Sequence, residues 1–216
     1  TLDEASASAV VQAARLYQEA VWIAEERPEW SWVMLVSAVE RAAAHWQTAT
    51  IDPSEWLGEL EPSLKGVFED SECPDLFGVV AQKLGKYAGA VKRFRQFVLE
   101  FLPPPPPLRP PHGQISWTNE NLEKAMSVIY GWRSRYLHMG VPFPSPMCEP
   151  PVRERGWPAH SERPLGLATR TAGGTWLAKD VPMLLHVFEH IIRQVLLKWW
   201  RELMPAVPDL NRATLE

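Results

Sequence analysis

The chain places an arginine and a histidine five residues apart, Arg133 and His138, within the segment 130–140 (YGWRSRYLHMG). A neutral imidazole accepts a proton from a hydroxyl, and an imidazolium protonates a leaving oxygen. A guanidinium holds a phosphate through two N–H donors and stabilises added negative charge. RNA carries its own nucleophile, the 2′-OH. His138 is therefore the candidate acid/base and Arg133 the candidate phosphate clamp of an RNA-cleaving site.

A helix over residues 119–138 must position these two side chains. Thr118 is a suitable N-cap residue, and Gly140 followed by Pro142 supplies a stop. Five residues on an ideal helix turn a side chain by about 140°. The two groups therefore do not share one face of a straight helix. Either the helix unwinds near Leu137, or two subunits bring paired motifs into one cleft.

Three further residues are candidates to support the motif. Ser134 would position Arg133 or the phosphate, and Tyr130 would pack the motif or stack a base. Glu40, in an Ala-rich part of an earlier predicted helix, would pair with Arg133 and orient it. The alternative for Glu40 is an exposed helix glutamate, and the alternative for the whole motif is a structural Arg133 salt bridge with His138 at a helix C-terminus.

An arginine-rich stretch surrounds the motif. Residues 130–170 hold six arginines and three glutamates, with aromatic residues interleaved. Arg135, Arg153 and Arg155 are the candidate RNA contacts of this stretch. The alternative is a solvated loop, in which these side chains are ordinary surface residues.

The motif resembles the Arg-x4–6-His signature of HEPN domains. Its wider form, Tyr130-Gly-Trp-Arg-Ser-x3-His138-x-Gly140, is most similar to the Apea-like branch, whose pattern is roughly Tyr-x-x-Arg-Ser-x3-His-Gly; here Met139 moves the glycine one place along. The segment 30–49, with Ser37-Ala-Val-Glu40, is similar to the second helix of that family.

The resemblance implies a HEPN-like helical bundle and a metal-independent ribonuclease that needs no cofactor. It also implies a two-fold homodimer with facing motifs. The expected setting is a stress response or a phage or toxin–antitoxin conflict, with the protein as toxin and an antitoxin or other protein as a further partner. The same fold also occurs as a non-catalytic module that binds a nucleotide, RNA or a protein, and this alternative stays open.

Charge divides the chain into two halves. Residues 1–78 hold 15 acidic and 4 basic residues, whereas residues 79–216 hold 11 acidic and 18 basic residues. A polyanion would therefore dock on the second half. Segregated but simply solvated helix faces are the alternative.

The hydrophobic pattern predicts an all-α protein of five or more helices in one domain over residues 1–216. N-terminal helices fill residues 1–102, with expected helices at 4–26, 30–49, 53–61, 63–70, 75–88 and 90–102. A Pro-rich connector follows at 103–117, then the motif helix at 118–140, an irregular Pro-rich insertion at 141–179 and a C-terminal helix at 180–204. Asp180 is the expected cap of that last helix, and residues 170–176 are a candidate hairpin. Several of the eleven Trp residues are expected in the core.

Other candidate groups are weaker. His186 and His190 lie one helical turn apart, a spacing that can hold zinc, but further ligands are missing and no metal is expected. Cys148 near His138 is more readily a bystander thiol than a nucleophile.

Two distant cysteines without an export signal indicate a cytoplasmic protein. No apolar run reaches membrane-spanning length, so no membrane is expected. The first residue is Thr1, which suggests a trimmed start or a piece of a longer chain.

Overall fold

The computed structural model describes residues 2–46, 52–60, 62–71, 73, 75–153, 155–165, 168–171, 174–177 and 181–204. Within these residues the protein is mainly helical, which confirms the all-α class. The helices and strands are α1 (Glu4–Ile23), α2 (Pro28–Trp46), α3 (Pro53–Leu60), α4 (Pro62–Glu69), α5 (Leu76–Glu100), α6 (Asn119–Met139), α7 (Ser145–Cys148), β1 (Ala168–Thr171), β2 (Gly174–Leu177) and α8 (Leu185–Leu203).

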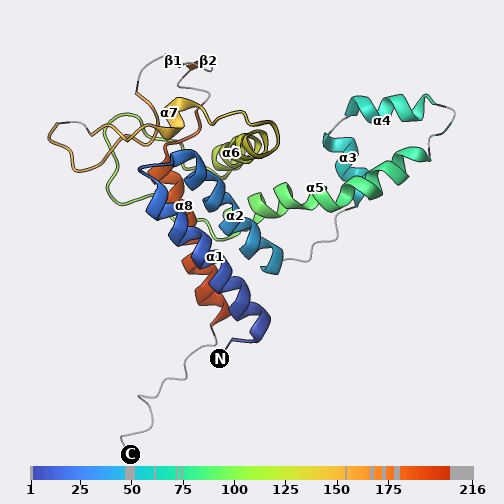
Figure 1. The fold of residues 1–216 in the computed structure, drawn as a ribbon, viewed down its shortest axis with the longest axis horizontal. Helices are drawn as coiled ribbons and strands as arrows, with labels where there is room; N and C mark the ends of the chain where they lie inside the picture. The colour runs from blue at the N-terminus through green and yellow to red at the C-terminus, as the bar shows by residue number, and fades with distance from the viewer. Residues whose placement is uncertain are drawn as a thin grey trace, which may run out of the picture.

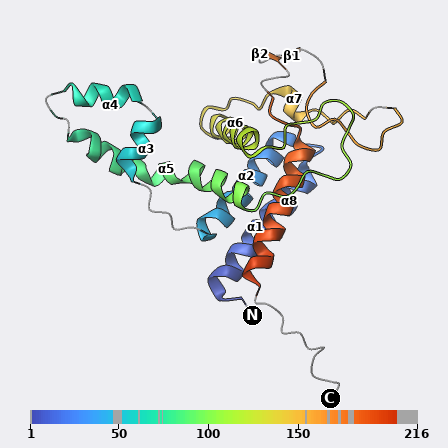
Figure 2. The ribbon, with the colours of Figure 1, turned by 180° about the vertical axis from the view of Figure 1, so that it is seen from behind.

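Helices α1, α2 and α8 pack side by side and form the central bundle (Figures 1 and 2). An apolar stripe along α2, which includes Leu35, Val36 and Val39, faces this bundle and is buried. Trp32 of α2 stacks on Phe188 of α8 at 4.8 Å between ring centroids, and Trp199 of α8 is also buried. The expectation that several tryptophans fill the core is therefore confirmed.

Helix α5 leaves the bundle and carries α3 and α4 at its far end (Figure 1). The sequence predicted two helices here, 75–88 and 90–102, and that division is wrong. The chain passes through the buried Gly89 without a break. A glycine inside a helix costs about 1 kcal/mol, and buried packing by Phe94 and Phe97 offsets that cost.

The Pro-rich connector contains no helix or strand, and its ends are tied together. The indole Nε1 of Trp117 donates a hydrogen bond to the carbonyl of Pro103 at 3.0 Å. The insertion that follows α6 is not wholly irregular, because it contains the short α7 and an antiparallel hairpin. In that hairpin Thr169 pairs with Trp176, as expected for residues 170–176.

Helix α8 begins later than the sequence predicted. Its first residue is Leu185, and the expected cap, Asp180, lies outside the described residues. Pro182 disfavours helical geometry for the residue before it. The side chain of Leu184 is buried, and its N–H donates to the carbonyl of Glu162 at 2.9 Å. This tertiary bond holds the residue before α8 in an extended conformation.

Candidate functional site

Helix α6 carries the motif and has well-formed ends. The side chain of Thr118 accepts a hydrogen bond from the N–H of Asn121 at 3.4 Å. Gly140 ends the helix with a φ of 65°, in the left-handed region that favours glycine, and its N–H donates to the carbonyl of Tyr136 at 3.2 Å. Both predicted ends are confirmed. Of the two alternatives for bringing Arg133 and His138 together, unwinding near Leu137 is not observed, because the left-handed residue comes only after Met139.

Glu40 of α2 joins two residues of the motif. Its Oε1 accepts the hydroxyl of Tyr130 at 2.6 Å, and its Oε2 accepts the Nη2 of Arg133 at 2.6 Å. The side chains of Arg133 and Glu40 are 18% and 22% exposed, so the ion pair is largely removed from solvent. Of the two alternatives for Glu40, the structure has the pairing with Arg133 and not the exposed helix glutamate.

The hydrogen bonds to Glu40 also affect the protonation of Tyr130 and the charge balance of Arg133. Burial, followed by the hydrogen bond to Glu40, raises the pKa of Tyr130 above its ordinary value. Tyr130 therefore stays protonated and remains a donor at neutral pH. The guanidinium carbon of Arg133 lies 5.6 Å from the centroid of the Tyr130 ring. Its Nε is buried without a hydrogen-bond partner among the described residues. Arg133 is held on two sides, and the carboxylate of Glu40 balances its charge.

His138 is exposed on another side of the same helix. It lies three residues after Arg135, so the two side chains are only about 60° apart around the helix axis. Arg135 is also exposed, and its guanidinium carbon lies 4.1 Å from the ring centroid of Trp132. No hydrogen bond or ion pair between described residues joins His138 to Arg133. The motif therefore separates into an inward arginine and an outward histidine.

The remaining candidate residues are placed as follows. Ser134 is half-buried, and the structure records no hydrogen bond from it to Arg133 in the described ranges. Arg153 and Arg155 are exposed on a loop of the insertion. The Nε of Arg153 donates to the carbonyl of Trp157 at 2.9 Å. That loop projects away from α6 in both views (Figures 1 and 2).

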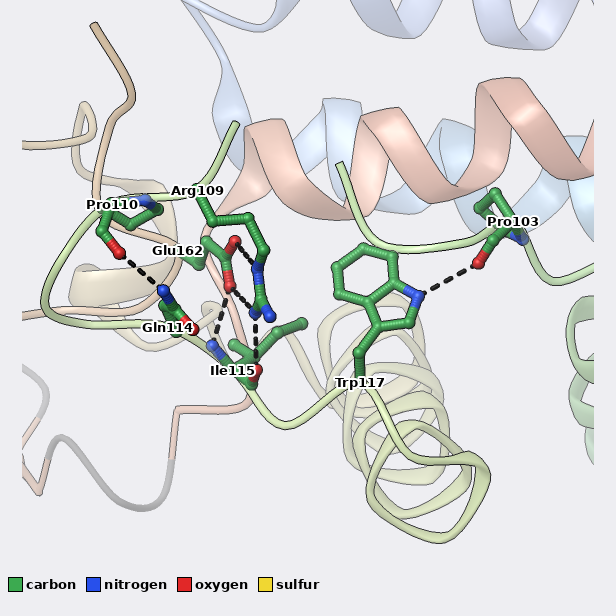
Figure 3. A network of polar contacts seen from close by, with 7 residues as sticks. All are labelled: Pro103, Arg109, Pro110, Gln114, Ile115, Trp117 and Glu162. Atoms are coloured by element: carbon green, nitrogen blue, oxygen red, sulfur yellow. Dashed lines mark hydrogen bonds and ion pairs between the residues drawn. The ribbon is translucent and has the colours of Figure 1, made fainter. Parts of the chain in front are cut away.

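An ion pair that the sequence did not suggest joins the connector to the insertion. Arg109 donates from Nε and Nη2 to the two carboxylate oxygens of Glu162 at 2.7 and 2.5 Å, and Nη2 also donates to the carbonyl of Ile115 at 2.6 Å (Figure 3). The N–H of Ile115 donates to Glu162 at 2.8 Å. Glu162 is only 4% exposed. The two residues are 53 positions apart, and nothing local marks either as buried.

The weaker candidates do not form a site. Burial, followed by the charge of His160, lowers the pKa of His186 to about 4, and its Nδ1 is buried without a partner. No group of three or more His, Cys, Asp or Glu among the described residues has a geometry that holds a metal ion. Burial raises the pKa of Cys148 to about 12, so its thiol stays protonated and is a poor nucleophile.

The fold thus defines an all-α protein, and none of its described helices is long and apolar enough to cross a bilayer. No family model, curated protein or solved structure matches the chain.

Proposed function

We propose that the protein is a metal-independent endoribonuclease of the HEPN type, built on a HEPN-like helical bundle. The observation that carries this proposal is the motif of α6, in which Glu40 and Tyr130 fix the guanidinium of Arg133 while His138 faces solvent five residues later. In the proposed reaction, His138 takes the proton of the RNA 2′-OH or protonates the leaving 5′ oxygen. The 2′ oxygen attacks the adjacent phosphorus, the bond to the 5′ oxygen breaks, and a 2′,3′-cyclic phosphate results. The 5′ oxygen leaves as a hydroxyl, with its proton from His138 or from water.

The proposal requires two copies of the chain for a site that uses both motif residues. Helix α6 is intact to Met139, so Arg133 and His138 of one chain point to different sides. A two-fold pair with facing motifs would place the His138 of one copy near the Arg133 of the other. The exposed apolar side chains of Leu137 (41% exposed) and Met139 (70% exposed) flank His138 and supply a surface that a second copy would cover.

One observation favours a second candidate function. Glu40 already balances the charge of Arg133, and a guanidinium in an ion pair attracts phosphate less strongly than a free one. The alternative is therefore a non-catalytic module of the same kind, which binds RNA, a nucleotide or a protein partner. In this alternative the network of Glu40, Tyr130 and Arg133 serves only to fasten α6 to α2.

Incubation with single-stranded RNA in EDTA distinguishes the two functions. The proposed enzyme cleaves RNA without divalent metal and leaves 2′,3′-cyclic phosphate ends. His138→Ala should lower the rate by a factor of about 100 or more, the usual contribution of a general acid or base. His112→Ala is the matched control, because His112 is an exposed histidine of the connector and should cleave like the wild type.

The dimer is tested by the same assay over a range of protein concentrations, together with the mass in solution by light scattering. Specific activity should rise as the dimer forms. Met139→Glu should lower both the dimer fraction and the specific activity. The toxin role adds one expectation: expression arrests growth, and His138→Ala relieves the arrest. Cleavage that survives His138→Ala, or that requires metal, overturns the catalytic assignment. RNA that stays intact while binding is tight establishes the non-catalytic module.

A further inference from the structure

A groove lies beside the N-terminal half of α6, away from the Glu40 network. Its volume is about 490 Å³. The end of the connector, the segment around Arg163 and the residues just before α8 form its other walls. The lining residues used below are Lys124, Val128 and Arg163.

Two cations, Lys124 and Arg163, are the charged groups among the described lining residues of this groove. Arg163 is exposed and forms no ion pair with another residue of the described ranges. Lys124 bonds to Glu120 at 2.7 Å, but their side chains are 70% and 77% exposed. Such an exposed pair contributes little and exchanges readily with solvent or another anion.

The neighbouring acid of Arg163 does not cancel its charge in the groove. Glu162 turns inward, where Arg109 and the N–H of Ile115 hold it (Figure 3). Its side chain is 5% exposed. At these consecutive positions of the insertion, Glu162 is therefore buried in the interior, whereas Arg163 lines the groove. Among its described lining residues the groove therefore keeps a positive charge, which the alternation of acid and base at Glu162 and Arg163 in the sequence does not indicate.

The side of α6 that lines the groove continues as an exposed helix face toward the motif. Lys124, Val128 and Arg135 lie within about 40° of one another around the helix axis, and His138 lies about 60° from Arg135. The rise of 1.5 Å per residue places Lys124 about 21 Å from His138 along the axis. All three polar side chains are exposed. One side of one helix therefore runs from the two-cation groove to the candidate acid/base.

We call the groove and the exposed side of α6 up to His138 the track. We propose that this track binds the phosphate backbone of single-stranded RNA and leads it to His138. The inference rests on the proposed function for its end point. Lys124 and Arg163 contact phosphates in the groove, Arg135 contacts a phosphate nearer His138, and the exposed side chain of Val128 lies under the ribose and base. No aromatic side chain of the described residues lines the groove, so these residues offer no stacking platform of the kind that aromatic residues give single strands. Binding is therefore electrostatic and tolerant of sequence.

The salt dependence of binding tests the track quantitatively. The probe is a labelled 2′-O-methyl RNA oligonucleotide longer than 21 Å, which lacks the 2′-OH nucleophile and stays intact. For a single strand, each neutralised phosphate contributes about 0.7 to the slope of log affinity against log salt concentration. Lys124→Ala and Arg163→Ala should each make that slope shallower by about 0.7, and the double variant by about 1.4. Lys198→Ala and Arg201→Ala remove exposed cations of α8 and should leave the slope unchanged.

The outcomes separate this inference from the proposed function. A wild type that does not bind the probe, or groove variants with the wild-type slope, overturns the track. Preference for a duplex probe over the single strand also overturns it. Cleavage of an RNA dinucleotide by the wild type and by His138→Ala tests the catalytic assignment alone, because a dinucleotide is too short to reach the groove. If the groove variants change the salt slope but the wild type does not cleave the dinucleotide, the ribonuclease proposal is overturned and the RNA-binding track is retained.

Discussion

Replacement of Glu40 by alanine is the most direct test of the network that holds the motif. The substitution removes the acceptor of both 2.6 Å hydrogen bonds, from Tyr130 and from Arg133. Loss of one partner of a fully buried ion pair typically costs about 3–5 kcal/mol. Here about one fifth of each charged side chain is exposed, so water can partly solvate the orphaned guanidinium. We therefore expect Glu40→Ala to lower the free energy of unfolding by about 2–3 kcal/mol.

A thermal melt followed by circular dichroism at pH 7 measures this loss. For a chain of this size, 1 kcal/mol corresponds to roughly 2–4 °C, so the midpoint should fall by about 4–12 °C. Glu123→Ala is the matched control, because Glu123 pairs with Arg95 at 3.7 Å and the two side chains are 47% and 33% exposed. That control should change stability by no more than about 1 kcal/mol.

A double-mutant cycle isolates the pair itself. Combining Glu40→Ala with Arg133→Met should restore part of the lost stability, because the cycle then leaves no unpaired guanidinium beside α2. A Glu40→Ala midpoint equal to that of Glu123→Ala would refute the reasoning, since it would mean that the network contributes nothing to the fold. Additive single losses would likewise show that the two side chains do not interact.

Two further predictions concern the insertion and the start of α8. Glu162→Ala removes both bonds to Arg109 and the acceptor of the Ile115 N–H, so it should cost about 3–5 kcal/mol in urea unfolding; a loss below about 1 kcal/mol would contradict the role of this pair. The low pKa of His186, about 4, favours its neutral form in the folded state. Because the unfolded chain binds that proton near pH 6.5, stability should be complete above pH 6.5 and decline toward pH 4. His186→Asn should flatten this part of the stability profile measured by urea unfolding, and a profile as steep as that of the wild type would contradict the assignment.

Local signals were sufficient where the sequence predicted the structure well. The ends of α6 depend on Thr118 and Gly140, whose roles as caps follow from their own backbone and side-chain chemistry. The apolar stripe of α2 follows from helical periodicity alone. Both features lie within a few residues of the element that they define, so no knowledge of the tertiary structure was needed.

Long-range contacts account for what the sequence did not predict. Gly89 resembles a helix break, yet the packing of Phe94 and Phe97 on the bundle maintains α5 through it. Glu40 and Arg133 are 93 positions apart, so residue types suggested the pair while only the crossing of α2 and α6 brings it about. The sequence did not indicate the ion pair of Arg109 and Glu162, because each residue lies in a Pro-rich segment without periodicity.

The direction of Arg133 decides which assemblies can support catalysis. Within one chain the intact last turn of α6 leaves Arg135, and not Arg133, on the side of His138. A site built from one copy would therefore use Arg135 as its phosphate contact and would leave the Glu40 network purely structural. A site that uses Arg133 as the clamp requires a second copy. The phosphate would then share the guanidinium with Glu40, because Nη2 of Arg133 donates to that carboxylate. The resemblance to HEPN domains, in which Arg133 is the clamp, therefore fits the geometry of this chain only under the proposed dimer.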